Sequence, residues 1–262
     1  MERINIGSVT LNVELRGAGP VLLLVHGFPL DHQMWRHQID AFSATCRVIA
    51  PDLRGFGQSD VTPGVVTMQQ FADDLAALLD KLSINEPVTF CGLSMGGYIA
   101  WQFAEHHTRR LGRLVLCDTK AVADTPAAAQ GRLETAQQVL ASGPQGLIDA
   151  MTPKLFAPAT LESQPEMVKL TQQVMRTTSA EGIAAALRGM SQRPDVTASL
   201  PNIAVPTLVI CGTSDAIAPP AEMRGIAAAI PHAQFVEIEN AGHMAPLESP
   251  APCNAALARF LK

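Results

Sequence analysis

Apolar and polar positions follow two different rhythms along the chain. Short apolar runs are typical of strands, and longer runs with an apolar residue every three or four positions are typical of helices. Val9–Leu15 alternates residue by residue, which indicates a strand with one buried face. Val21–Gly27 is a continuous apolar run, which indicates a strand covered on both faces. Further strand runs are Arg47–Asp52, Val88–Leu93, Arg113–Asp118, Thr207–Gly212 and Gln234–Glu239.

Helical patterns separate these strand runs. Thr67–Leu82 carries one apolar stripe, formed by Phe71, Leu75, Leu78, Leu79 and Leu82. Met95–His107 and the closing segment 251–262 are also helical in pattern. Strands that alternate with helices predict an α/β fold, with a mostly parallel sheet flanked by helices on both faces.

The alternation stops between residues 120 and 205, where every pattern is helical: 131–140, 146–151, 165–175 and 180–190. We therefore predict a core formed by 1–119 and 206–262, and a helical cap formed by 120–205. Open α/β sheets bind ligands at the carboxyl ends of their strands. The inserted helices are expected to cover a site there as a lid.

Composition narrows the class of protein. The 262 residues are 47% hydrophobic and 16% charged, as expected of one large globular domain. The net charge of −5, without a basic cluster, argues against nucleic acid as a partner. The N-terminus lacks a secretory pattern, and no apolar run reaches membrane-spanning length. Five cysteines without metal-ligand spacing favour a reduced, cytoplasmic compartment and no metal.

The strongest chemical signal is the segment Gly92–Gly96, which reads G-x-S-x-G between a predicted strand and a predicted helix. A serine in such a turn has a strained backbone, so the residues two positions away must be small. Its hydroxyl is exposed at a helix N-terminus, where developing negative charge is favoured. We predict that Ser94 is a catalytic nucleophile; the alternative is an idle serine in a glycine-rich turn.

A serine nucleophile needs a base, and the base needs a carboxylate that orients it. His243 follows the last strand run in a loop ended by prolines, so we predict that it is the base. Asp215 directly follows Thr207–Gly212 and is the predicted acid, with Asp118 at another strand end as its rival. For His26, a structural hydrogen bond is the expected role.

Two backbone N–H groups are expected to stabilise the oxyanion. One belongs to Met95, directly after the serine, and the other to Phe28, in the loop after Val21–Gly27. For Phe28, the alternative is a plain packing role. In the loop Asp52–Asp60, Arg54 is expected to pair with a nearby carboxylate or carbonyl group rather than to act in catalysis.

The chain resembles the α/β-hydrolase superfamily over nearly its whole length, through "HGFPLDHQMW", "DLRGFGQSD", "CGLSMGGYIAWQFA", "TLVICGTSD" and "AGHMAPLESP". The resemblance implies an eight-stranded sheet, a helical cap inserted after strand 6, a Ser94–His243–Asp215 triad, and no metal or organic cofactor. Parts of the sequence look like 3-oxoadipate enol-lactonases and related carboxylesterases. "HGFPLD" looks like the cofactor-free haloperoxidases and perhydrolases, in which a proline follows the oxyanion residue, as Pro29 does here.

These motifs predict a serine hydrolase that cleaves a small carboxylic ester or lactone through an acyl-enzyme. One alternative is a perhydrolase that uses the same triad, and another is a ligand receptor with slow turnover. The cap carries no obvious pair of cations for a dicarboxylate, which weakens a strict enol-lactonase assignment. Candidate pocket residues are Pro29, Trp35, Leu155, Phe156, Met190 and Met244. The simpler role is core packing for most of them, and stiffening of its loop for Pro29.

Overall fold

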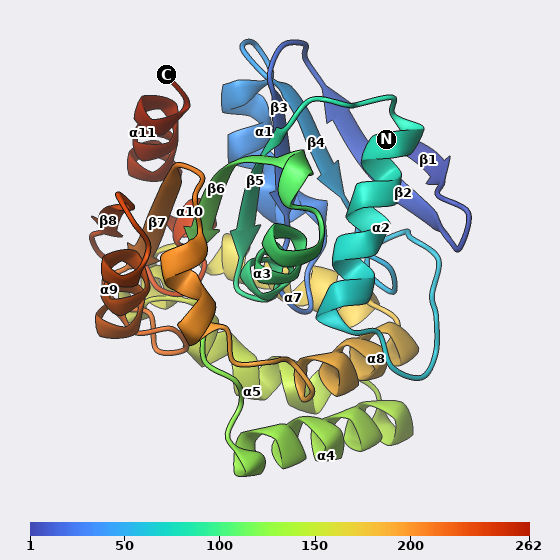
Figure 1. Cartoon of the computed structure of the whole chain (residues 1–262). Coiled ribbons are helices and arrows are strands. Elements are labelled where there is room, and N and C mark those ends of the chain that lie inside the picture. Colours follow the sequence, from blue (N-terminus) through green and yellow to red (C-terminus); the bar gives the residue numbers. More distant parts are fainter.

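A single eight-stranded sheet forms the centre of the protein, in a computed structural model that describes all of residues 1–262 (Figure 1). The strand order is β1-β2-β4-β3-β5-β6-β7-β8. Strands β1 and β2 pair antiparallel, β2 pairs antiparallel with β4, and all other neighbours are parallel. This confirms the predicted fold class. The bounds are β1 Glu2–Asn5, β2 Thr10–Arg16, β3 Val21–Val25, β4 Arg47–Pro51, β5 Val88–Leu93, β6 Leu111–Cys117, β7 Thr207–Gly212 and β8 Gln234–Ile238.

Helices cover both faces of the sheet, as the continuous apolar strand runs require. Successive residues of β3 point to opposite faces: Leu22 and Leu24 belong to one hydrophobic cluster, and Leu23 and Val25 to the other. The first cluster packs against α1 (Arg36–Phe42) and α11 (Pro250–Leu261). The second packs against α2 (Met68–Lys81), α3 (Met95–His106) and α9 (Pro220–Ala229).

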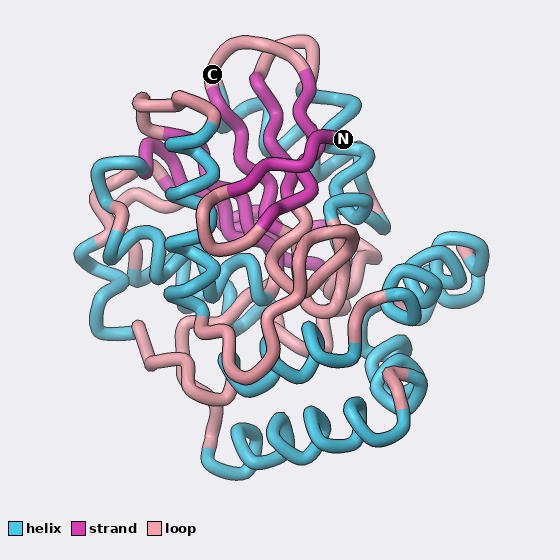
Figure 2. Tube along the Cα trace, turned by 90° about the vertical axis from the view of Figure 1, so that its right-hand side faces the viewer, coloured by secondary structure: helices cyan, strands magenta, loops and turns pink.

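All structure between β6 and β7 is helical. The elements are α4 (Pro126–Ser142), α5 (Gln145–Leu155), α6 (Pro158–Ser163), α7 (Pro165–Thr177), α8 (Ala180–Met190) and the 3-10 helix η3 (Thr197–Asn202). Figure 1 shows α4, α5 and α8 gathered below the sheet, and in Figure 2 helices again form a layer beneath the strands. No helix is both long and apolar enough to cross a membrane. The short elements η1 (His32–Trp35), η2 (Thr108–Arg110) and α10 (Ala245–Glu248) complete the chain.

Helix α8 packs directly on the loop between β4 and α2, at two points. A Cβ atom added to Gly182 would lie 1.9 Å from the carbonyl oxygen of Gly55, and one added to Gly189 would lie 1.7 Å from that of Val66. The N–H of Val66 also donates to the carbonyl of Ala185 at 3.1 Å. Helix α8 therefore reaches the core at backbone-to-backbone distance.

The loop after β4 is fixed by a buried ion pair. Arg54 Nε donates to Asp74 Oδ2 of α2 at 2.7 Å, and the exposed fractions of these residues are 6% and 3%. The predicted pairing of Arg54 with a carboxylate is confirmed. Because Arg54 pairs with Asp74 of α2, it ties the loop to that helix.

Candidate active site

Ser94 lies in a sharp turn between β5 and α3, with φ 55° and ψ −111°. The glycines around it are required by close contacts. A Cβ atom added to Gly92 would lie 2.4 Å from the carbonyl carbon of Gly96, and one added to Gly96 would lie 2.3 Å from the carbonyl oxygen of Val25. Ser94 is partly exposed, whereas its two chain neighbours are buried. The turn therefore presents the serine side chain outward from a tightly packed backbone.

The neighbouring strand β6 holds this turn. The N–H of Ser94 donates to the carbonyl of Cys117 at 2.9 Å. The carbonyl of Ser94 accepts a hydrogen bond from the hydroxyl of Thr119 at 2.8 Å. Both backbone groups of the strained residue are thus satisfied from the carboxyl end of β6, which fixes the direction of its side chain.

His243 and Asp215 form a buried hydrogen-bonded pair. The distance from His243 Nδ1 to Asp215 Oδ2 is 2.8 Å, and the exposed fractions are 2% and 4%. The other oxygen of Asp215 accepts from the N–H groups of Ile217 at 2.7 Å and Ala218 at 3.0 Å. The carboxylate faces Nδ1, so Nδ1 carries the proton and Nε2 is the basic nitrogen. This agrees with a base–acid relation between the two residues.

The parallel strands bring these residues to one edge of the sheet. Ser94 follows β5 and Asp215 follows β7, and both strands pair with β6. His243 lies in the loop after β8, at the same carboxyl-terminal edge. The side chain of Asp118, the rival acid, hydrogen-bonds the N–H of Gly212 at 2.8 Å instead of the imidazole.

Glu248, which no sequence motif singled out as a functional residue, holds the histidine loop. Its Oε1 accepts from the N–H groups of Gly242 at 2.9 Å and Met244 at 3.2 Å, on either side of His243. Its Oε2 accepts from the N–H of Ala157, between α5 and α6, at 2.8 Å. Burial raises the pKa of Glu248, and these N–H groups oppose that shift. One carboxylate therefore ties the histidine loop to the inserted helices.

We expect Glu248→Gln to lower the free energy of unfolding by about 1–3 kcal/mol, since one amide oxygen cannot serve N–H groups on both sides and the NH₂ group would face an unpaired donor. Urea unfolding of both proteins measures this difference. Glu239→Gln, at an exposed position, is the matched control and should unfold at the wild-type midpoint. Equal midpoints for wild type and Glu248→Gln would contradict the assigned role.

The loop after β3 runs beside the Ser94 turn. A Cβ atom added to Gly27 would lie 3.4 Å from the Cβ of Ser94. The N–H of Phe28 makes no hydrogen bond within the protein, and Met95 is the first residue of α3, where helix geometry provides no internal acceptor. Two free N–H donors thus lie on residues next to Gly27 and Ser94.

His26 supports this loop as expected. It is fully buried, and its Nε2 accepts from the N–H of Leu53 at 3.0 Å while Nδ1 lies 2.9 Å from the carbonyl of Gly27. Burial lowers the pKa of His26 to about 4, so the ring is neutral at pH 7. The structural hydrogen bond predicted for His26 is confirmed.

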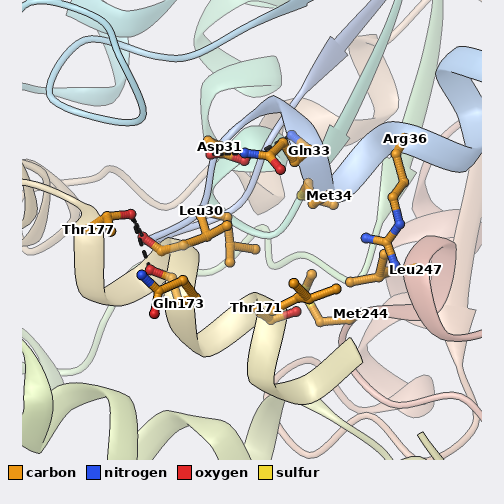
Figure 3. Close-up of a pocket in the computed structure, with 12 residues that line it drawn as sticks. Leu30, Asp31, Gln33, Met34, Arg36, Thr171, Gln173, Thr177, Met244 and Leu247 are labelled. Carbon is orange, nitrogen blue, oxygen red and sulfur yellow. Dashed lines mark hydrogen bonds between the residues drawn. The ribbon is translucent and has the colours of Figure 1, made fainter. Parts of the chain in front are cut away.

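A cavity of about 250 Å³ lies between η1, α1, α7 and the segment after His243 (Figure 3). Leu30, Met34, Met244 and Leu247 form part of its apolar lining, and Arg36 extends toward Leu247. Of the six candidate pocket residues, Met244 lines this cavity. Trp35, Leu155 and Phe156 pack in the same hydrophobic cluster as Met244, and Met190 packs in the other. The carbonyl of Pro29 accepts from Thr178 Oγ1 at 3.3 Å.

Comparison with known proteins agrees with this architecture. Residues 20–250 match the family model described as alpha/beta hydrolase fold. The chain belongs to the alpha/beta hydrolase family. This hydrolase is 31% identical over 243 residues to 3-oxoadipate enol-lactonase 2 of Acinetobacter baylyi, covering 93% of the chain and 89% of the relative.

Two solved structures are similar to this hydrolase. A thermophilic esterase from Thermogutta terrifontis, described as malate bound, has 45% identity and a TM-score of 0.95, covering 97% of this chain and 93% of the esterase. The enol-lactonase from Burkholderia xenovorans has 31% identity and a TM-score of 0.92, covering 99% of both chains. Together with the site geometry, these similarities make the protein an ester hydrolase of the enol-lactonase-like branch.

Proposed function

We propose that this enzyme cleaves a small carboxylic ester or lactone through an acyl-enzyme, with Ser94 as nucleophile, His243 as base and Asp215 as the acid that orients the base. The observation that carries the proposal is the buried hydrogen bond of 2.8 Å between His243 Nδ1 and Asp215 Oδ2. It leaves Nε2 as the basic nitrogen at the same sheet edge as the strained Ser94 turn.

The chemistry proceeds in two halves. Ser94 Oγ attacks the carbonyl carbon while His243 Nε2 takes its proton, and the imidazolium is stabilised by Asp215. His243 then gives the proton to the leaving alkoxide, and the acyl group stays on Ser94. Water, deprotonated by His243, attacks the acyl-enzyme, the bond from the acyl carbon to Ser94 Oγ breaks, and His243 returns the proton to Ser94 Oγ as the acid is released. In a lactone, the alcohol and the acid remain parts of one product.

The N–H groups of Phe28 and Met95 are the proposed oxyanion donors. Each half-reaction passes through a tetrahedral intermediate in which the former carbonyl oxygen carries a negative charge. Preorganised N–H groups stabilise this oxyanion more than they stabilise the neutral carbonyl group of the ground state. The support is positional: Phe28 follows Gly27, where an added Cβ atom would lie 3.4 Å from the Cβ of Ser94, and Met95 follows Ser94 directly. Removal of one such donor typically costs about 2.7–4 kcal/mol of transition-state stabilisation.

A fluorophosphonate reagent tests the nucleophile directly, because it forms a stable covalent bond with an activated serine. The expected result is one adduct per chain, located on Ser94 by peptide mass mapping. Rapid mixing with p-nitrophenyl acetate should also give a burst of p-nitrophenol if deacylation is slower than acylation. An active enzyme whose adduct lies on another residue would rule out Ser94.

We further propose that the preferred substrate carries a free carboxylate, as a lactone of the enol-lactonase type does. Arg36 supports this. Its half-buried guanidinium lines the cavity beside Met244 and makes no ion pair or hydrogen bond with the protein. Burial lowers the pKa of Arg36, and no neighbouring carboxylate opposes this shift. A partly desolvated, unpaired guanidinium favours a carboxylate ligand, whose two oxygens can accept two parallel N–H···O hydrogen bonds along one edge of the guanidinium.

We expect Arg36→Gln to raise KM for the mono-p-nitrophenyl ester of glutaric acid by about 10-fold, since a hydrogen bond to a charged group contributes roughly 1.5–3 kcal/mol. KM for p-nitrophenyl butyrate, which has no second carboxylate, should stay unchanged. Steady-state kinetics on both esters measures the difference. Arg109→Gln, at an exposed arginine, is the control. An equal effect on both esters would contradict carboxylate recognition.

Perhydrolase activity stays a prediction for the same triad. It rests on Pro29, whose carbonyl accepts a hydrogen bond from Thr178 at the start of the turn before α8. Formation of peracetic acid from acetate and hydrogen peroxide, lost in a Pro29 variant that still hydrolyses p-nitrophenyl acetate, would support it. Hydrolysis without any peracid would exclude it.

A further inference from the structure

Asp118 is a buried carboxyl group that the proposed mechanism does not use. It follows β6 directly, has no exposed surface, and adopts a φ of 48°, a left-handed conformation that aspartate tolerates better than most residues. Its Oδ1 accepts one hydrogen bond, from the N–H of Gly212 at 2.8 Å. Its Oδ2 is buried and makes no hydrogen bond, and the nearby thiol of Cys211 donates to the carbonyls of Gly212 and Ala218. An orphaned carboxylate oxygen in the interior is costly and needs an explanation.

The explanation lies in the neighbour of Asp118. One carboxylate oxygen of Asp118, one of Asp215 and the Sγ atom of Cys211 all lie within 4.8 Å of one another, and all three residues are buried. The other titratable groups around Asp118 are the thiols of Cys117 and Cys253 and, across Asp215, the imidazole of His243. No lysine or arginine forms an ion pair with Asp118 or Asp215, and the ion-pair partner of Asp215 is His243. Two buried carboxylates at this separation do not both stay ionised.

Hydrogen bonding decides which carboxyl group keeps the charge. Asp215 accepts from three N–H donors, those of Ile217, Ala218 and His243. Asp118 accepts from one, that of Gly212. Hydrogen-bond donors stabilise the charged form of a carboxyl group, so the negative charge belongs on Asp215 and the proton on Asp118. In agreement, burial and the charge of Asp215 raise the pKa of Asp118 well above its usual range.

We propose that Asp118 is a positioning residue, a neutral carboxylic acid whose Oδ2–H donates to the carboxylate of Asp215 and fixes it against His243. The inference rests on the proposed triad. The proton stays on Asp118 throughout, and Asp118 touches neither the substrate nor the imidazole. The hydrogen bond satisfies the orphaned oxygen and gives Asp215 a fourth donor.

Two substitutions separate a neutral donor from a charged acid. In Asp118→Asn, the amide is also neutral, can donate to Asp215, and tolerates a positive φ. We expect kcat within about 3-fold of wild type and an unshifted acid limb in the pH profile of kcat/KM. If Asp118 were ionised, the same change would remove a negative charge near His243 and move the acid limb to lower pH by a unit or more. That shift would overturn the proposal.

Asp118→Ala removes the donor. We expect kcat to fall by about 10-fold with KM unchanged, which corresponds to the loss of one hydrogen bond to a charged group. Full kcat in Asp118→Ala would show that Asp215 needs no such support. If the alanine protein does not fold, the pH profile of Asp118→Asn still decides between a neutral and a charged residue.

Fluorophosphonate labelling of wild type and of both variants keeps the two hypotheses apart. A wild-type enzyme labelled elsewhere than Ser94 would refute the proposed function, whatever the variants do. Labelling of Ser94 in all three proteins, with an altered acid limb in Asp118→Asn, would refute only the role of Asp118.

Discussion

Replacing Ser94 with alanine is expected to lower kcat by about 10⁶-fold, the loss typical of a triad that loses its nucleophile. The substitution should not disturb the fold. Ser94 already has a Cβ atom at φ 55°, as alanine would have. The hydrogen bonds of its backbone with Cys117 and Thr119 do not involve the Ser94 hydroxyl group. The p-nitrophenyl esters of acetate, butyrate and octanoate measure the loss, and the wild-type profile over these chain lengths reports the size of the acyl pocket.

The matched control for this experiment is Ser142→Ala, which removes an exposed hydroxyl at the end of α4. It should retain the wild-type kcat on all three esters. Circular dichroism should give the same melting curve for wild type and Ser94→Ala. Unchanged ester hydrolysis by a correctly folded Ser94→Ala protein would end the assignment of Ser94 as nucleophile.

Asp215→Asn should lower kcat by about 10⁴-fold, because the amide would impose the wrong imidazole tautomer. The N–H groups of Ile217 and Ala218 require an oxygen at the Oδ1 position. The amide nitrogen then faces His243 Nδ1 and donates to it, which moves the ring proton to Nε2. His243 could no longer accept the serine proton. The pH dependence of kcat and the ring resonances of His243 by NMR would detect this change.

Asp73→Asn provides a control with the same chemistry at the surface. His107 Nε2 lies 2.8 Å from Asp73 Oδ1, and the carboxylate is 45% exposed. Removing its charge should leave kcat unchanged, because this pair lies between α2 and the end of α3, outside the site. A similar loss in both aspartate variants would point to a general effect of lost charge rather than to the tautomer of His243.

Periodicity predicted most of the fold and failed where elements are short or rich in small residues. Seven strand runs and the helical patterns of the inserted segment correspond to observed elements. Strand β1 was missed because it is a four-residue edge strand without a buried face. Helix α1 has only seven residues, and α9 is rich in alanine, so neither shows a distinct apolar stripe.

For the site, the sequence predicted the residues that lie in motifs, but it did not predict residues that come close to them only when the chain folds. Ser94, Asp215 and His243 each follow a strand, so parallel topology alone brings them to one edge. The positions of Glu248 and Arg36 beside the histidine segment result from the packing of distant segments, and no pattern in a single sequence reveals such contacts. Asp118 was noticed as a strand-end acid, but its burial beside Asp215 required the structure.

The inserted helices differ in how well they should tolerate substitution, because α8 contains two glycines that contact the core. At Gly182 and Gly189, any side chain would push the helix away from the β4–α2 loop at Gly55 and Val66, so random mutagenesis should recover these positions almost unchanged. The exposed surface of α4, where few side chains are buried, imposes no such constraint. Libraries that aim to alter substrate range would therefore retain more folded members if diversity is placed on the exposed surface of α4 and the sequence of α8 is kept unchanged.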